Sequence, residues 1–244
     1  MITTISSLKA QQLDSVKIKF YEHQLYDVME IIDTIILVSK LKQVVSNYEQ
    51  NPTEINKVKL GIIYHETALN LTFLKKSKYK GYALKSYELL TQLENNETTT
   101  TALLPYIASY RASALSLTGG ETMKLKLVDD AFKLFEQAVK KYGNISYLPE
   151  FLRGSVAENL PWFFFSKIKF AKIDMQSIID KQNKNNEYAN WKIMSFTYWA
   201  WANQHQSKKD RGQALNYLIK AIALDPDYKA GRAKAEALKV KFAK

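Results

Sequence analysis

The chain of 244 residues contains no cysteine and is poor in the residues that form tight turns, with 8 glycines and 5 prolines. The first absence excludes disulfide bonds and thiolate chemistry. The second argues against a β-rich protein, because the many turns of such a fold need glycine and proline. The chain is 46% apolar and is long enough to bury a sizeable core. We therefore expect a globular, mainly helical protein.

Long hydrophobic runs and targeting signals are also missing. The most apolar stretch, residues 28–38, is interrupted by Glu30 and Asp33 and is far shorter than the ~20 residues that span a bilayer. We expect a buried helix there and no membrane span. Residues 1–7 show no basic stretch followed by an apolar core, so no secretory signal is predicted. This favours a cytoplasmic protein, although a trimmed chain would hide such a signal.

The sequence offers no constellation of catalytic or metal-binding residues. The three histidines, His23, His65 and His205, are far apart and form no metal-ligand pair at helical spacing. Asp129 and Asp130 stand at the expected start of a helix, where the positive end of the helix dipole favours acidic side chains. No phosphate loop, dinucleotide fingerprint or Gly-x-Ser-x-Gly motif is present. We expect no metal, no cofactor and no enzymatic activity.

One three-point pattern recurs three times: a small residue is followed four and seven positions later by apolar residues. Spacings of four and three place all three side chains on one stripe of a helix. A small residue in that stripe lets a second helix approach closely, so the pattern predicts repeated helix pairs. It occurs at Ala83, Tyr87 and Leu90, at Ala131, Phe135 and Ala138, and at Ala214, Leu218 and Ala221.

The last copy resembles a tetratricopeptide repeat, a helix–turn–helix unit of about 34 residues. Residues 195–228 fit that length without a gap, with Tyr198 as the large aromatic residue of the first helix, Ala202 one turn later and Pro226 closing the unit. The earlier copies begin at Tyr64 and Tyr110 and resemble the family less. Their helices are separated by longer gaps and they lack the closing proline. A fourth, degenerate unit is expected around Ala171, Met175 and Ile178.

This resemblance implies a single all-α domain over residues 1–244, built as a right-handed solenoid of antiparallel helix pairs. Residues 1–50 would form N-terminal capping helices, residues 51–228 the repeats and residues 229–244 a C-terminal capping helix. Proteins of this architecture usually bind another molecule and rarely carry out chemistry. The apolar stripe of the C-terminal helix is expected to comprise Tyr228, Gly231, Ala235, Leu238 and Phe242.

Local signals predict several helix boundaries. Asn51 reads as a helix cap, followed by Pro52 at the first helical position and by Glu54 in the first turn. The segment 225–227, Asp-Pro-Asp, repeats this device before the last helix. The segment 118–120, Thr-Gly-Gly, predicts a loop between two helices.

In the tetratricopeptide family the first helix of each pair lines a concave groove. The residues that the resemblance places there are a mixture of aromatic, aliphatic and polar side chains, which suits an extended or helical peptide. The same positions could equally make ordinary surface or inter-repeat contacts. Some family members clamp a C-terminal carboxylate with Lys and Asn at the positions of His65 and Leu69, so we do not expect that ligand. The groove residues are His65, Leu69, Arg111, Leu115, Phe196, Trp199 and Asn203.

The run Pro-Trp-Phe-Phe-Phe at residues 161–165 is the most unusual local feature. Phe164 starts a helical stripe that continues through Ile168 and Ala171, so part of the run is expected to pack in the core. We favour core packing for the run as a whole. An exposed aromatic patch or a ligand cleft is the alternative.

The net charge of +11 is concentrated near the C-terminus, where residues 208–244 hold ten Lys or Arg against four acidic residues. A second cluster lies at residues 75–80. Such patches attract acidic proteins, nucleic acid or anionic membranes, but a solvated basic surface is the simpler interpretation. The basic patch comprises Lys75, Lys76, Lys78, Lys80, Lys234, Lys239 and Lys241.

Two functions of different class remain. We expect a protein-interaction scaffold that binds a peptide or protein segment in its groove. The alternative is a regulator or accessory factor that binds nucleic acid or another polyanion through its basic surface, in which case affinity would fall steeply with salt. The partner's identity and the oligomeric state cannot be read from the sequence.

Overall fold

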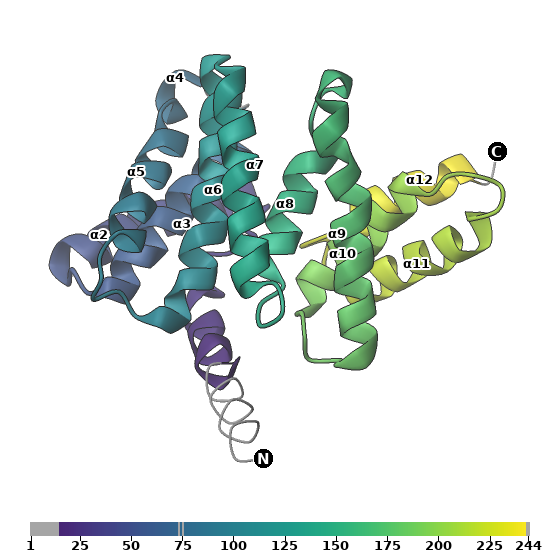
Figure 1. Ribbon diagram of the computed structural model, residues 1–244, viewed down its shortest axis with the longest axis horizontal. Coiled ribbons are helices and arrows are strands. Elements are labelled where there is room, and N and C mark those ends of the chain that lie inside the picture. Colours follow the sequence, from purple (N-terminus) through teal and green to yellow (C-terminus); the bar gives the residue numbers. More distant parts are fainter. Residues whose placement is uncertain (1–14, 73, 75, 243–244) are drawn as a thin grey trace. The chain divides into compact units, whose positions relative to one another are not determined.

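The computed structural model describes residues 15–72, 74 and 76–242 (Figure 1). These residues contain helices and no strand, which confirms the expected all-α class. Residues 15–25 form a helical segment. The elements that follow are α2 (Thr34–Gln50), α3 (Glu54–Leu71), α4 (Lys76–Tyr79), α5 (Tyr82–Glu94), η1 (Thr101–Leu103), α6 (Leu104–Thr122), α7 (Leu125–Tyr142), α8 (Leu148–Glu158), η2 (Trp162–Phe164), α9 (Phe165–Lys184), α10 (Trp191–Gln204), α11 (Arg211–Leu224) and α12 (Arg232–Phe242).

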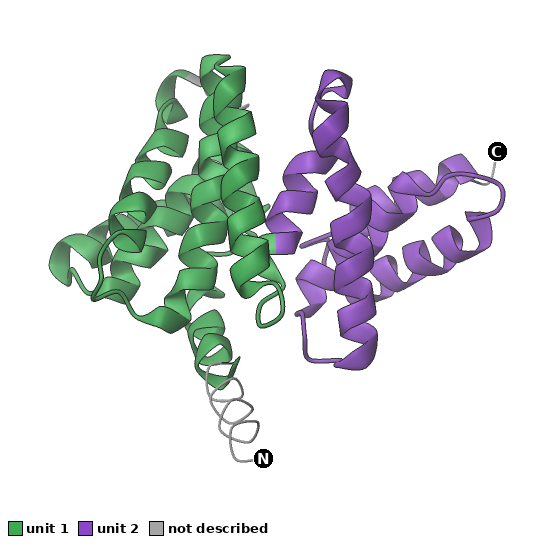
Figure 2. Ribbon diagram, in the orientation of Figure 1, with its two compact units in different colours: residues 1–149 green, residues 150–244 purple. Residues whose placement is uncertain are grey.

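The chain divides into two compact units, Met1–Pro149 and Glu150–Lys244 (Figure 2). We call them unit 1 and unit 2. In unit 1, α2, α3, α5, α6 and α7 each contact the next, and α3 also contacts α6. In unit 2, α9, α10, α11 and α12 are packed in the same sequential way, and α10 also contacts α12. Helices therefore pack mainly against their neighbours in sequence, as helix pairs do.

The stretch 28–38 is not the single buried helix that its composition predicts. Residues 26–30 form turns and bends, and α2 begins only at Thr34. The Asp33 carboxylate accepts hydrogen bonds from the backbone N–H groups of Ile35 and Ile36, at 2.8 and 2.9 Å. Asp33 thus interrupts the apolar run because it is the N-cap of α2. Ile35 and Ile36 point to solvent, whereas Leu37 is buried.

Two other predicted boundaries are also wrong. The cap of α3 is Thr53, whose hydroxyl accepts from Asn56 N–H, while Asn51 ends α2. The predicted loop at 118–120 is helical, since α6 continues to Thr122. A β-carbon on Gly119 would lie 3.0 Å from a methyl group of Val128. This glycine therefore serves the close packing of α6 on α7 and does not form a turn.

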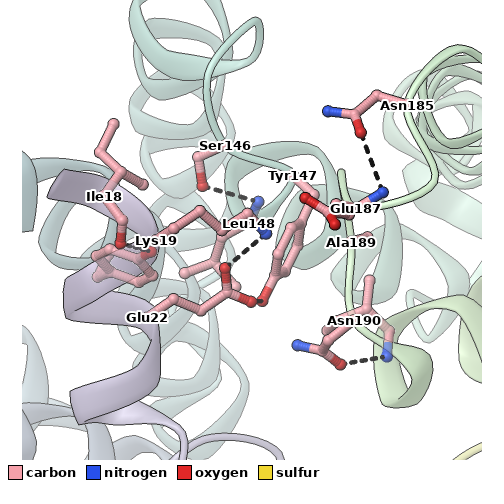
Figure 3. Close-up of polar contacts among 12 residues, drawn as sticks. Ile18, Lys19, Glu22, Ser146, Tyr147, Leu148, Asn185, Glu187, Ala189 and Asn190 are labelled. Carbon is pink, nitrogen blue, oxygen red and sulfur yellow. Dashed lines mark hydrogen bonds and ion pairs between the residues drawn. The ribbon is translucent and has the colours of Figure 1, made fainter. Parts of the chain in front are cut away.

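The helical segment 15–25 is fixed to unit 1 by buried polar contacts. The Tyr106 hydroxyl donates to the backbone carbonyl of Ile18 at 2.8 Å. The Tyr147 hydroxyl donates to the Glu22 carboxylate at 2.6 Å, and Lys19 reaches the other carboxylate oxygen at 2.8 Å (Figure 3). Burial, followed by the charge of Glu22, raises the pKa of Tyr147 well above its usual value. The phenol therefore stays neutral and serves as a hydrogen-bond donor.

Unit 2 contains a buried ion pair between α8 and α9. Arg153 donates to both oxygens of Asp174, at 2.9 and 2.7 Å, and its guanidinium also lies 4.2 Å from the ring centroid of Phe170. Burial raises the pKa of Asp174 to about 6, although Arg153 acts in the opposite direction. The pair ties the third turn of α9 to α8.

The last helix starts later than the segment 225–227 predicts. Asp225 is fully buried, and its carboxylate accepts hydrogen bonds from the backbone N–H groups of Lys229, Ala230 and Arg232. It therefore organises a loop that leads into α12, which begins at Arg232. In the predicted stripe, Tyr228 is exposed, whereas the other members, Gly231, Ala235, Leu238 and Phe242, are buried.

Candidate functional site

The groove residues predicted in unit 1 do not form an open surface. His65 is only 1% exposed, and its Nε2 lies 2.7 Å from the Ser113 hydroxyl while its Nδ1 lies 3.3 Å from Glu66. The ring also packs edge-on against Tyr110. Leu115 is buried as well. Both side chains are therefore interior residues of unit 1 and face no solvent groove.

The other two predicted residues of unit 1 differ from these. Arg111 forms an ion pair with Glu94, with 2.7 Å between Nε and the carboxylate oxygen. Leu69 is exposed at the surface of α3. A partly shielded ion pair and one aliphatic side chain do not make a recognition surface, so unit 1 contributes little to a candidate site.

The three predicted residues of unit 2 lie together on one face of α10. Phe196, Trp199 and Asn203 are spaced by three and four residues and are each half-buried. The Phe196 ring packs edge-on against Phe151 of α8 at 5.4 Å and against Trp199 at 5.1 Å between centroids. The result is a row of three aromatic rings with part of its surface open to solvent. We call the surface formed by this row and its charged neighbours, Lys234 and Glu158, the α10–α12 face.

A lysine from α12 lies over this row. The ammonium group of Lys234 is 4.4 Å from the ring centroid of Trp199 and 5.2 Å from that of Phe196. Both distances are within the range of cation–π attraction. Lys234 is exposed as a residue, but the rings displace water from its charged end. This desolvation lowers its pKa.

A glycine contact sets the position of Lys234. A β-carbon on Gly231 would lie 2.5 Å from the backbone carbonyl oxygen of Ser195, so only glycine permits this approach of α12 to α10. The Ser195 hydroxyl accepts from Gly231 N–H at 3.1 Å and donates to the Ala221 carbonyl at 2.8 Å. One turn beyond this contact, Lys234 on α12 and Trp199 on α10 come together. The predicted basic residue and the predicted groove residue thus belong to one site.

Glu158, at the end of α8, supplies a negative group that the sequence did not nominate. It accepts 2.5 Å hydrogen bonds from the side-chain amides of Asn203 and Gln204. Burial raises the pKa of this carboxyl, and the two amide donors and Lys234 oppose the shift. Asn203 therefore holds Glu158 in place, and its NH₂ group is already engaged. Since Glu158 and Asn203 are 45 residues apart, no local pattern could have paired them.

The remaining members of the basic patch are scattered. Lys75 lies outside the described residues, and the side chain of Lys76 is not described. Lys78 and Lys80 are exposed in unit 1. Lys239 and Lys241 are exposed on the last turns of α12 in unit 2. Among the patch lysines whose side chains are described, Lys234 alone lies against aromatic groups of the predicted groove.

The aromatic run at 161–165 is exposed, contrary to the interpretation that we favour from the sequence. Trp162 is 82% exposed and Phe165 79%, with Phe163 at 47%. Only Phe164 of the four aromatic residues is half-buried. Ala171, Met175 and Ile178 do form the buried stripe of α9. The helix register therefore turns the start of α9 outward while its middle packs inward.

Unit 2 also has one hollow of about 240 Å³, lined by Gln182, Asn186, Ala189, Trp191, Met194, Tyr198 and Leu224. It is smaller than the roughly 300 Å³ at which small-molecule sites begin, and it contains no charged side chain. It gives no reason to assign a ligand.

In the part of the chain that the structure describes, no group of three His, Asp or Glu side chains could hold a metal ion. No helix in residues 15–72, 74 and 76–242 is both long and apolar enough to cross a membrane. Comparison of the chain with models of protein families, with curated proteins and with solved structures found no match.

Proposed function

We propose that this protein is a non-enzymatic interaction scaffold that binds a peptide segment on the α10–α12 face of unit 2. The observation that carries the proposal is the row Phe151–Phe196–Trp199 with the Lys234 ammonium 4.4 Å from the last ring. Aromatic rings with a cationic neighbour are typical centres of binding energy at protein interfaces.

We further propose that the helices belong to a right-handed solenoid of tetratricopeptide-like pairs. The contacts of α3 with α6 and of α10 with α12 support this interpretation. In such a solenoid the first helix of each pair packs against the first helix of the next as well as against its own partner. The pairs would be α3 with α5, α6 with α7 and α10 with α11, with α12 as the terminal cap.

The chemistry of the face defines the ligand that it fits. An aliphatic or aromatic side chain would pack on Trp199 and Phe196, where it removes apolar surface from water. An acidic side chain or a carboxylate beside it would pair with Lys234, whose charge is already partly desolvated. Glu158 has lone pairs that its two amide donors do not use, and these can accept backbone N–H groups of an extended peptide. We therefore expect a ligand with an apolar residue next to an acidic one.

A displayed library of random peptides, selected against the intact chain, tests this proposal. The selected sequences should pair an apolar residue with an acidic one and should bind more weakly to Trp199→Ala by about 30-fold or more, equivalent to a hot spot of ~2 kcal/mol. Trp162→Ala is the matched control, because it removes an exposed tryptophan from the same unit outside this face. It should leave peptide affinity unchanged.

The assignment of the site would be wrong if Trp199→Ala and Trp162→Ala both lost peptide binding, or if both retained it. Circular dichroism would verify that Trp199→Ala keeps its helical content. If the basic surface is instead the functional one, the protein would bind single-stranded DNA in a salt-sensitive manner, and Lys239→Gln with Lys241→Gln would abolish that binding while Trp199→Ala would not.

A further inference from the structure

The start of α9 presents an exposed apolar tip. Trp162 and Phe165 are 82% and 79% exposed, and Phe163 is 47% exposed between them. The rings form a chain, with Trp162 edge-on to Phe163 at 6.1 Å and Phe163 tilted against Phe164 at 4.9 Å. Burying large aromatic side chains contributes much to stability and leaving them in water contributes nothing. A cluster exposed to this extent therefore indicates a surface that is covered in the functional state.

The charged residues next to this tip in the sequence have one sign. Residues 159–173 include Lys167, Lys169 and Lys172 and no acidic residue. Lys169 and Lys172 are exposed. Along the helix, Phe165, Lys169 and Lys172 follow at spacings of four and three, so they share one face of α9. The aromatic tip is thus continuous with a basic helical face.

The aromatic tip is followed by turns of α9 that are packed against α8. Phe170, one turn into α9, lies against the guanidinium of Arg153, which in turn forms the buried pair with Asp174. These contacts hold the second and third turns of α9 against α8. Less ordering entropy is therefore lost when the tip binds than if it were part of a mobile loop.

We propose that the aromatic tip, Trp162 with Phe163 and Phe165, inserts into the interface of an anionic phospholipid membrane, with Lys169 and Lys172 against the lipid headgroups. Tryptophan and phenylalanine beside lysines are the combination by which surface-bound helices enter the headgroup region. The single sign of charge selects anionic lipids. An apolar protein partner would not require the lysines, and an acidic one would not require three exposed aromatic rings.

This surface lies on α9 and the preceding η2, and its residues are not those of the proposed peptide-binding face. The two proposals are therefore independent, and each supplies the control for the other. Docking through the tip would not require a segment that crosses the bilayer.

Co-sedimentation with vesicles tests the proposal, using phosphatidylcholine alone and phosphatidylcholine mixed with phosphatidylserine. The intact chain should bind the mixed vesicles, bind the neutral ones more weakly, and release with increasing salt. Lys169→Gln with Lys172→Gln should weaken binding by about 30-fold, because each lysine near an anionic surface contributes about fivefold. Trp162→Ser with Phe165→Ser should weaken it by at least about tenfold.

Three controls make the result specific. Lys239→Gln with Lys241→Gln removes the same charge from α12, Ile219→Ser with Val240→Ser removes exposed apolar surface elsewhere in unit 2, and Trp199→Ala removes the peptide site. All three should bind vesicles as the wild type does. Brominated phospholipid should quench tryptophan fluorescence in the wild type and much less in Trp162→Phe, a variant that keeps an aromatic ring at the tip.

Absence of binding to the mixed vesicles would overturn the proposal. So would binding that persists in both tip variants, or that is lost in the α12 variant. If the wild type sediments as a dimer in the ultracentrifuge, does not bind vesicles, and becomes a monomer in Trp162→Ser with Phe165→Ser, then a second copy of the chain covers the tip and the lipid assignment is wrong.

Discussion

The two units differ in how far they expose their aromatic residues. In unit 1, Tyr106 and Tyr147 are buried and donate hydrogen bonds to groups of the N-terminal helical segment. All four tryptophans of the chain are in unit 2, where Trp162 is exposed and Trp199 is half-buried beside a lysine. Both units bury part of their aromatic residues, but the two most exposed rings of the described residues, those of Trp162 and Phe165, belong to unit 2.

The difference between the units is clearest at His65 and Trp199, which occupy equivalent positions in the repeat pattern. His65 and Trp199 each follow the tyrosine of a first helix. His65 is enclosed because Ser113 and Tyr110 of α6 contact its ring directly. Trp199 meets α12 instead, which approaches through Gly231 and places the long side chain of Lys234 over the ring. The same register therefore gives a core residue in one unit and a surface residue in the other.

The largest expected effect is the difference in stability between a variant at His65 and a variant at Trp199. His65→Ala would leave a cavity and remove the partner of Ser113, so it should lower the free energy of unfolding by about 4 kcal/mol. Trp199→Ala, at a half-exposed position, should cost only about 1 kcal/mol of stability but should weaken peptide binding by about 30-fold or more. Urea denaturation of both variants, followed by circular dichroism, checks the difference. Equal losses of stability would remove the distinction between the units.

The second effect concerns the pH dependence of unit 2. Burial raises the pKa of Asp174 to about 6 from the ordinary 3.8. The folded state therefore binds a proton more tightly than the unfolded state does, and this contribution to stability is full below pH ~4 and is lost as the pH rises to about 6. A shift of about two units corresponds to ~3 kcal/mol.

Asp174→Asn should remove this part of the pH dependence. The free energy of unfolding, measured by urea denaturation from pH 4 to 7, should fall less steeply with pH in the variant than in the wild type. Parallel curves would show that Asp174 titrates in the folded state as it does in the unfolded chain, and that Arg153 fully offsets the effect of burial.

A smaller effect is expected from the polar contacts of unit 1. Tyr147→Phe removes the hydrogen bond to Glu22 and leaves a buried carboxylate with fewer donors, which should cost about 2 kcal/mol. Amide hydrogen exchange should show faster opening of residues 15–25 in this variant. Tyr228→Phe is the control, because its hydroxyl bonds to Glu236 at an exposed site, and it should have almost no effect.

The smallest effect tests the charge on the α10–α12 face. Lys234→Gln should weaken binding of an acidic selected peptide by about tenfold and leave stability within ~0.5 kcal/mol. The control is Lys220→Gln, which removes an equal charge from α11. Lys220 lies over the rings of Tyr198 on α10 and Tyr217 on α11. Fluorescence anisotropy of the labelled peptide would measure both, and equal weakening would point to net charge as the cause.

The helices and their pairing could be predicted because they depend on local periodicity. The stripes at Ala83, Ala131 and Ala214 do lie on α5, α7 and α11, and each of these helices contacts its predicted partner. The ends of the helices were less predictable. Asp33 starts α2 as its N-cap, and Gly119 continues α6 because it packs closely against α7. Burial at a repeat position was not predictable, because it depends on which side chain arrives from the next helix.

The candidate site was predicted in part for the same reason. The resemblance to tetratricopeptide repeats nominated Phe196, Trp199 and Asn203, and their helical spacing puts them on one face of α10. Lys234 was nominated for its charge alone, and Glu158 was not nominated, because their positions depend on how α8 and α12 pack against α10. The exposed tip had a clear signal, the aromatic run itself, but the packing of η2 and of the first turn of α9 decides that Trp162 and Phe165 face solvent.

The most direct test of the account is an NMR titration of the ¹⁵N-labelled chain with a selected peptide, observed at the indole N–H groups. The four tryptophans give four such signals, from Trp162, Trp191, Trp199 and Trp201. We expect the Trp199 signal to shift in proportion to the bound fraction while the Trp162 signal stays in place. A peptide that binds and leaves Trp199 unchanged would contradict the assignment of the binding site to the α10–α12 face.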